Sequence, residues 1–309
     1  MRPHSVIPMS VWALVVMAFV NMIWGAAYPI TKPALLDMPP ISFAFWRFVV
    51  ALTVLIPLAP RATWVLITGP ERKRFFVMGL IGFCITQITQ VEALTLSPST
   101  HIALLSATTP LWVAGLAHIM LGERITRRMM LGICIAICGM ILVLNPERSG
   151  SVGLGAMIGY VIYIVSAFCW GMYTVMGRSL MQTHPPVPAT AAATFYGVVC
   201  LLPFAIGEYA FGLVTNITVA TVSGILYTGL MVTVVGYLAL FWALQRTTSG
   251  KVSAMMYFQP IAGVAVAWVW LHEQPNLLFF VGSALTLLGV WFVTSQPSRR
   301  SQPTVAAEQ

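Results

Sequence analysis

Arg47 and Glu92 are the two charged residues of this sequence that stand inside long apolar runs. Arg47 lies in the run 41–59, and Glu92 lies near the end of the run 75–94. A charge in such surroundings is costly and usually faces the protein interior with a partner. Two interpretations follow: a buried ion pair that holds helices together, or a contact with the carboxylate or amine of a bound solute.

Catalytic and nucleotide-binding motifs are missing from the sequence. The string Ser249-Gly250-Lys251-Val252 lacks the first glycine and the final hydroxyl residue of a phosphate-binding loop, so ATP hydrolysis has no support. No Ser-His-Asp arrangement or metal-ligand spacing stands out, and the five cysteines lie inside apolar runs. We therefore expect no enzyme, cofactor or metal, and energy from a gradient of the solute or of a coupled ion such as a proton.

Aromatic, amide and proline residues within the same runs could line a cavity for an amphiphilic, zwitterionic or aromatic metabolite. Packing or a membrane-interface belt would account for some of the aromatics. Pro110 and Pro260 are each predicted to break a helix near its middle. Each break could act as a hinge, could leave a backbone carbonyl free for the substrate, or could be a tolerated kink. The predicted cavity residues are Trp24, Tyr28, Arg47, Gln87, Gln90, Glu92, Pro110, Trp170, Tyr173, Tyr237, Gln259 and Pro260.

Two glutamates, Glu123 and Glu273, each open a short polar break between apolar runs. Each precedes a predicted helix start, at Thr126 and at Pro275-Asn276. A carboxylate there satisfies free N–H groups and the helix dipole. We interpret both glutamates as structural rather than as part of a functional site.

The composition of the chain predicts a membrane protein. Apolar residues make up 59% of its 309 residues and charged residues only 8%, whereas soluble domains contain about 25% charged residues. The net charge of +8 comes from basic residues in short loops between apolar runs. That pattern is typical of a cytoplasmic membrane face and not of a nucleic-acid groove.

Ten apolar runs are long enough, at about 20 residues, to be read as spanning helices. They cover residues 10–30, 41–59, 75–94, 101–121, 128–145, 154–178, 188–207, 218–243, 250–271 and 277–295. With the N-terminus inside, 13 Lys and Arg residues fall on the inner side and two, Lys32 and Arg148, outside. This asymmetry predicts an inner (plasma) membrane protein with both termini cytoplasmic.

The chain contains an internal repeat. The segments 99–143 and 249–293 align without a gap at an offset of 150, which matches Gly132 with Gly282 and Gly139 with Gly289. Upstream, Trp24-Gly25 matches Trp170-Gly171 at an offset of 146. Five helices per repeat would insert the second half upside down around a central cavity. The predicted units are a cytoplasmic N-terminus at 1–9, repeats at 10–145 and 152–295, and a disordered cytoplasmic tail at 296–309.

Three segments resemble EamA-type transporters of the drug/metabolite transporter superfamily: WGAAYPITKPALLDMPPISFAFWRFVVA, PLWVAGLAHIMLGERIT and QPIAGVAVAWVWLHEQP. The resemblance implies an all-α protein of ten helices that moves small organic solutes, most often outward. We expect export of amino acids or amino-acid-derived compounds. The alternatives are an importer of a metabolite or of a vitamin such as riboflavin, with the same fold, and a non-transporting membrane sensor or assembly subunit. The sequence leaves the substrate, the coupling ion and the oligomeric state open.

Overall fold

The computed structural model describes residues 9–97, 102, 105–106, 108–144, 154–211, 216–271 and 277–294, and every regular element in them is helical. The elements before the middle of the chain are α1 (Met9–Asp37), α2 (Pro40–Leu58), α3 (Pro60–Thr68), α4 (Arg72–Gly79), η1 (Leu80–Ile85), α5 (Thr86–Leu96), α7 (Thr109–Leu121) and α8 (Arg127–Leu144). Those after it are α9 (Leu154–Leu180), α10 (Pro186–Ala210), α11 (Val219–Leu226), η3 (Tyr227–Val235), α12 (Gly236–Leu244), α13 (Ser249–Ala254), η4 (Met255–Tyr257), α14 (Phe258–Leu271) and α15 (Leu277–Thr294).

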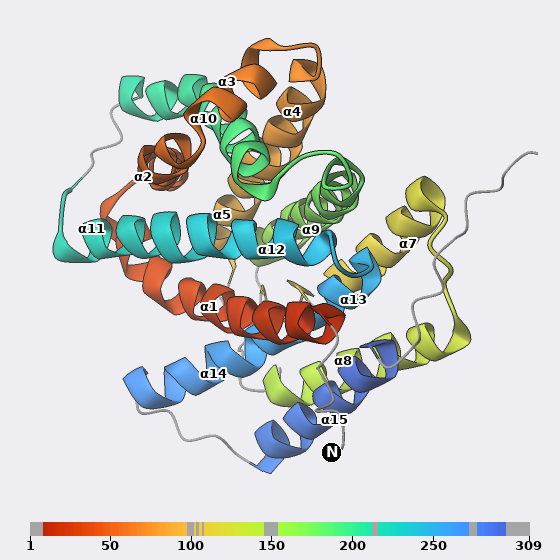
Figure 1. Ribbon diagram of the computed structural model, residues 1–309. Helices are drawn as coiled ribbons and strands as arrows, with labels where there is room; N and C mark the ends of the chain where they lie inside the picture. The colour runs from red at the N-terminus through yellow and green to blue at the C-terminus, as the bar shows by residue number, and fades with distance from the viewer. Residues whose placement is uncertain are drawn as a thin grey trace, which may run out of the picture.

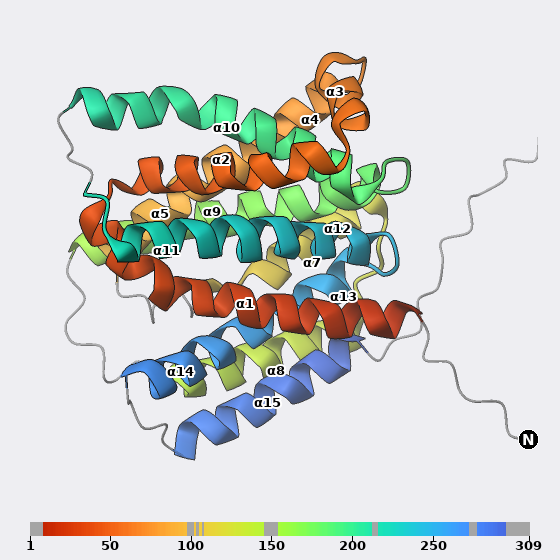
Figure 2. The same ribbon diagram turned by 60° about the vertical axis from the view of Figure 1, so that its left-hand side comes forward.

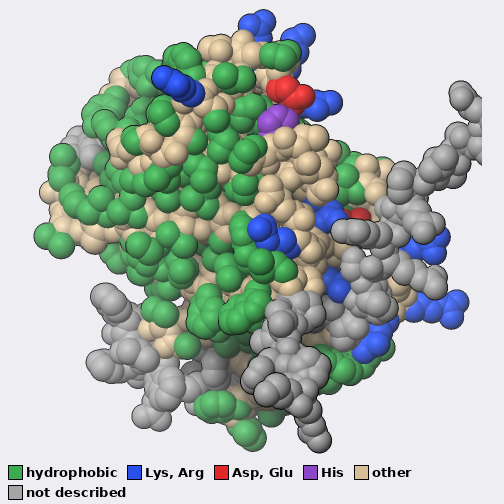
Figure 3. All heavy atoms as spheres, in the orientation of Figure 1, with side chains coloured by type: hydrophobic (Ala, Val, Ile, Leu, Met, Phe, Trp, Pro, Cys, Tyr) green, Lys and Arg blue, Asp and Glu red, His purple; other side chains and the backbone are tan. Residues whose placement is uncertain are grey.

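The helices lie side by side in one bundle (Figures 1 and 2). Within the described residues, six stretches are long and apolar enough to span a bilayer, and two further apolar helices are shorter. The six stretches are Met9–Asp37, Pro40–Leu58, Arg72–Leu96, Leu154–Leu180, Pro186–Ala210 and Val219–Leu244. Hydrophobic side chains cover much of the outer face, while Lys and Arg gather mainly along the upper right and right-hand edge (Figure 3). An apolar surface of this extent is what a lipid environment requires.

The two ends of the bundle can be defined by their polar contacts. At the Asp37 end, the Asp37 carbonyl accepts from the Asn216 amide at 2.8 Å, and Glu208 accepts from the amides of Ile41 and Ser42 at 3.0 and 2.6 Å. Glu208 thereby caps the N-terminus of α2. The N-cap residue of α2 itself is Pro39, whose side chain cannot accept a hydrogen bond from the first amides of the helix. A carboxylate from the second half of the chain thus holds a helix start of the first half.

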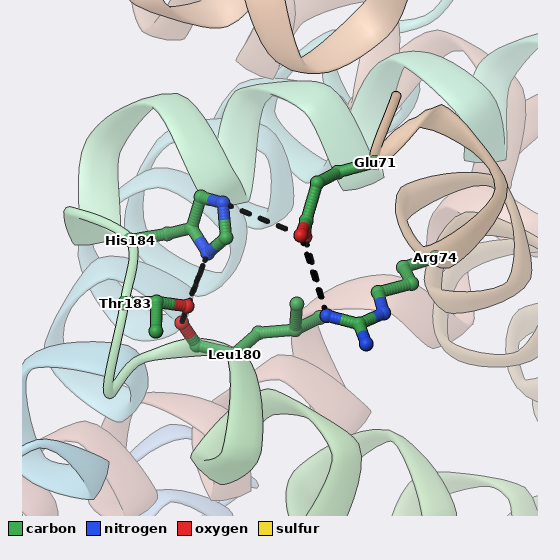
Figure 4. Close-up of polar contacts among 5 residues, drawn as sticks. All are labelled: Glu71, Arg74, Leu180, Thr183 and His184. Carbon is green, nitrogen blue, oxygen red and sulfur yellow. Dashed lines mark hydrogen bonds and ion pairs between the residues drawn. The ribbon is translucent and has the colours of Figure 1, made fainter. Parts of the chain in front are cut away.

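The opposite end, the Glu123 end, carries a second set of contacts between the halves. Figure 4 shows Glu71, at the start of α4, between Arg74 and His184. Its carboxylate lies 3.3 Å from Arg74 Nη1 and 3.6 Å from His184 Nε2, while the His184 ring also contacts the Thr183 hydroxyl. Because α4 belongs to the first half and His184 follows α9, this cluster ties the halves together.

Helices of the first half pack mainly on helices of the second. When each helix is replaced by its repeat counterpart, a contact of the first half becomes the matching contact of the second. The α1 helix contacts α14 and the α11–α12 stretch, and its counterpart α9 contacts α7 and α5. Two other extensive contacts join α2 to α10 and α8 to α15, and each of them pairs a helix with its own counterpart. The two halves therefore interlock around a shared centre.

Glycines set the close approach of α8 and α15. A side chain on Gly132 would overlap the Gly289 carbonyl, and one on Gly139 would overlap the Gly282 carbonyl. Residue numbers rise along α8 while those of its contacts fall along α15, so the two helices run antiparallel. The repeated glycines thus meet with their positions exchanged.

Three features of the helices differ from the sequence predictions. The run 101–121 has helical residues at 102, 105 and 106, a turn at Thr108 and then α7 from Thr109, and the run 250–271 is divided by the 3₁₀ turn η4. The short helix α3, with Pro60 in its first turn, occupies a stretch that was predicted to be a loop. Proline has a suitable φ angle for a first turn and lacks only an N–H that is unpaired there anyway, which explains the start of α3.

Candidate functional site

A cavity between the halves is lined by three helices that present residues at the spacing i, i+3, i+4, i+7. These stripes are Trp24, Ala27, Tyr28 and Thr31 on α1, Gln87, Gln90, Val91 and Leu94 on α5, and Tyr163, Ser166, Ala167 and Trp170 on α9. Arg47, Thr86, Thr109, Val232, Tyr237, Met256 and Gln259 complete the lining. The cavity offers about 80 Å³ to the centres of water molecules, which is room for several waters or a small polar head group.

The cavity lies toward the Asp37 end of the bundle. Its α1 stripe runs from Trp24 toward Asp37, whereas its α9 stripe runs from Trp170 back toward the start of α9. These directions agree because the C-terminus of α1 is at the Asp37 end and that of α9, at Arg178, is at the Glu123 end. The repeat-related tryptophans therefore mark the floor of the cavity.

Aromatic rings close this floor. The Trp24 and Trp170 ring centroids lie 5.3 Å apart at 87°, and Tyr237 lies 6.0 and 5.4 Å from them. Tyr173 packs beneath, 5.5 Å from Trp170 and 5.8 Å from Tyr237, and does not line the cavity. Edge-to-face contacts at such distances stabilise aromatic clusters, so the floor is a packed layer.

Hydrogen bonds to backbone and amide groups fix the orientation of the floor and wall residues. The Trp24 indole N–H donates to the Val232 carbonyl at 3.1 Å, within the π-helical turn η3. Gln259 Nε2 donates to Asn21 Oδ1 at 2.7 Å, which joins α14 to α1. Tyr28 and Tyr163 approach each other at 3.5 Å between their hydroxyl oxygens, higher in the cavity. Polar groups from both halves therefore face one space.

Arg47 and Glu92 do not form the predicted pair. The Arg47 guanidinium donates from Nη1 to Gln87 Oε1 at 3.2 Å and from Nη2 to Thr233 Oγ1 at 3.4 Å. Among the described residues it has no ion-pair partner, and Glu92 does not line the cavity. Glu92 follows Gln87 by five residues, or about 500° of helix rotation, so the two side chains point in different directions.

The two prolines stand at helix starts rather than in helix middles. Pro110 is in the first turn of α7, where the missing N–H breaks no helical bond, and it does not line the cavity. The helical run is nevertheless interrupted next to Pro110, since residues 102, 105 and 106 are helical and Thr108 forms a turn before α7. Pro260 is the third residue of α14, and its side chain lies outside the described part of the structure.

Glu123 caps a helix, but not the one that follows it. Its carboxylate accepts from the Ser249 amide at 3.2 Å and the Gly250 amide at 3.5 Å, at the start of α13. It also lies 3.0 Å from Arg178 Nε, and Arg178 donates to the Leu244 carbonyl at 3.1 Å. The structural role agrees with our interpretation, whereas the expected target at Thr126 does not. Glu273 lies outside the described residues.

Several cavity residues were missed in the sequence. They include Thr31, Thr86, Thr109, Tyr163 and Ser166. Helical spacing from a predicted cavity residue would have found Thr31, three positions after Tyr28, as well as Tyr163 and Ser166, seven and four positions before Trp170. Thr86 has a different signal: it lies 147 positions before Thr233, and each hydroxyl donates to the carbonyl five residues earlier at a π-helical turn.

Comparison with known proteins shows a family match over both halves. The profile described as the EamA-like transporter family matches residues 11–145 and 157–295. An "Uncharacterized transporter" of Archaeoglobus fulgidus is 26% identical, over 91% of this chain and 96% of that relative. A "Probable terminal-alkyne amino-acid exporter" of Streptantibioticus cattleyicolor is 27% identical, over 92% and 93%. A "Probable amino-acid metabolite efflux pump" of Salmonella typhimurium is 24% identical, over 88% and 91%.

A solved crystal structure has a similar fold. It aligns with a TM-score of 0.76 and 16% sequence identity, over 92% of this chain and 96% of that one. The likeness concerns the fold alone.

Proposed function

The chain belongs to the EamA-like transporter family, and from that premise we propose that it exports amino acids or amino-acid-derived compounds. The single observation that carries the proposal is the cavity between the halves, with aromatic walls and a few amide, hydroxyl and guanidinium groups. Such a lining suits a solute with an apolar body and a polar head. Two relatives whose names include amino-acid export, at 27% and 24% identity, support this substrate class and direction.

We further propose ten spanning helices in two inverted repeats. The support is the antiparallel contact of α8 with α15, the exchange of helix contacts between the halves and the repeat in the sequence. In such proteins the substrate site lies where the repeats meet, and one repeat moves against the other to alternate access. The Lys and Arg asymmetry orients the Glu123 end toward the cytoplasm.

Orientation can be tested by labelling. In a variant without its five native cysteines, single cysteines at Lys73 and Arg127 should react with a membrane-impermeant maleimide only after the cells are opened. A cysteine at Asn216, an exposed residue at the Asp37 end, should react in intact cells. Labelling of Arg127→Cys from outside would contradict the orientation.

The export proposal predicts a solute imbalance. Deletion of the gene should raise the internal level of at least one amino acid or derivative several-fold, and overexpression should raise it in the medium. Metabolite profiling of cytoplasm and medium measures both. A new nutrient requirement of the deletion strain would indicate import instead, and unchanged solutes in both strains would indicate a protein that does not transport.

A further inference from the structure

Arg47 is a buried cation that has no countercharge among the described residues. Only 6% of its surface is exposed, and it lines the cavity. Its guanidinium donates hydrogen bonds to the neutral groups of Gln87 and Thr233. Burying an ionised group without an opposite charge is costly, so such a group usually serves a function that compensates for its cost.

The described carboxylates are engaged elsewhere or lie outside the cavity lining. Glu208 caps α2, Glu123 lies against Arg178, and Glu71 lies against Arg74 and His184. Asp37 accepts from Thr218 at 2.7 Å, and Glu92 is not part of the lining. Within the part of the chain that the structure describes, the cavity therefore carries one positive charge and no negative one.

The guanidinium is also held ready for a ligand. It has five N–H donors, of which two are used, and Nε has no hydrogen-bond partner among the described residues. The Phe48 ring lies 4.7 Å from the guanidinium carbon, and Gln87 and Thr233 hold the group from two sides. An oriented guanidinium with free donors matches the geometry of a carboxylate, which it can bind through two parallel bonds.

We propose that Arg47 binds the carboxylate of the transported solute, so that the cavity selects organic anions and zwitterions over organic cations. The inference rests on the proposed function and adds the charge class of its substrate. A solute without an anionic group leaves Arg47 uncompensated, and an organic cation adds a second positive charge to the same space. In a zwitterion, the ammonium can lie against the ring faces of Trp24, Trp170 or Tyr237.

The test uses three probes that share one ring: 3-phenylpropionate, L-phenylalanine and 2-phenylethylamine, with aliphatic counterparts 4-methylpentanoate, L-leucine and isopentylamine. Purified full-length protein is titrated with each probe by thermal shift and calorimetry, and transport is measured in proteoliposomes. The carboxylate-bearing probes should bind and move, and the amines should not. Arg47→Gln should weaken carboxylate binding at least tenfold, and Arg47→Lys should restore part of it.

Stability separates this role from a structural one. Arg47→Gln removes a charge, and its removal breaks no ion pair in the described structure. The thermal midpoint of the ligand-free protein should therefore stay constant or rise. Arg128→Gln, which removes an exposed cation at the Glu123 end, is the matched control and should bind all probes as the wild type does.

The failures are distinguishable. Transport of the amines at the rate of the acids, or unchanged carboxylate binding by Arg47→Gln, would overturn the inference and leave the transporter proposal standing. A large drop in the ligand-free midpoint of Arg47→Gln would assign Arg47 to the scaffold. Absence of binding and transport for all six probes would contradict the proposed amino-acid substrate class together with this inference.

Discussion

Replacing Gly25 by valine should abolish folded, transport-competent protein. A side chain on Gly25 would overlap the carbonyl of Gln259, a backbone atom that can move only if α14 moves with it. Overpacking ordinarily costs about 1–3 kcal/mol, and a clash with backbone stands at or above that range. Because Trp24, Tyr28 and Gln259 all line the cavity, displacement of α14 would also deform the site. Size-exclusion profiles of extracted protein and transport in proteoliposomes measure the two effects.

Two other glycines give matched controls. Gly155 faces open space, so Gly155→Ala should preserve both the elution profile and transport. Gly171 is the repeat counterpart of Gly25, and its added carbon would lie 3.2 Å from the Trp112 side chain and 3.3 Å from the Val113 amide. Gly171→Ala should therefore have an intermediate effect. Wild-type behaviour of Gly25→Val would show that α1 and α14 do not approach as described.

Removal of the Glu123 carboxylate should destabilise the protein by about 2–3 kcal/mol. Glu123→Ala leaves Arg178, whose side chain is 23% exposed, without its anion, and leaves the first amides of α13 without an acceptor. The two groups act as one unit, so Glu123→Ala and Arg178→Ala together should cost less than the sum of their separate costs. Reversible unfolding in mixed micelles provides the four free energies of this cycle.

The Glu71–Arg74 contact is the control for that cycle. Its side chains are 35% and 67% exposed, and solvent screens such pairs, so Arg74→Ala should cost less than about 1 kcal/mol. An additive Glu123–Arg178 cycle would mean that the two residues do not interact in the folded protein.

Hydrophobic periodicity and the repeat were enough to predict a helical membrane protein and the tryptophans of the cavity floor. Trp24 and Trp170 could be singled out because a duplicated position inside a helix is brought to the shared centre when halves interlock. Glutamines and tyrosines within apolar runs were informative for a related reason, since a polar group in lipid must face protein. Six other members of the predicted set line the cavity, among them Tyr28, Gln90 and Gln259.

The wrong predictions have two physical causes: the direction in which a side chain leaves its helix, and partners that are far away in the sequence. Similar depth suggested that Glu92 would meet Arg47, but the helix rotation favours Gln87, one and a half turns earlier. Sequence proximity suggested that Glu123 would cap the next helix. Gly122, with φ of 66°, instead ends α7 in a left-handed turn, and the carboxylate reaches a helix more than 120 residues away. Such long-range partners leave no trace in local propensity.

The contact of α8 with α15 has a consequence for how such a chain can be assembled. The glycines of each helix lie against the backbone of the other helix, so two separate half-length polypeptides could meet through such a contact as an antiparallel homodimer. Joining both copies in one polypeptide removes the requirement that they stay identical. Arg47 of α2 shows the benefit, because the residue 146 positions later in α10 is Ala193. A homodimer would carry the arginine twice, whereas the fused chain holds a single guanidinium and can keep the opposite wall neutral.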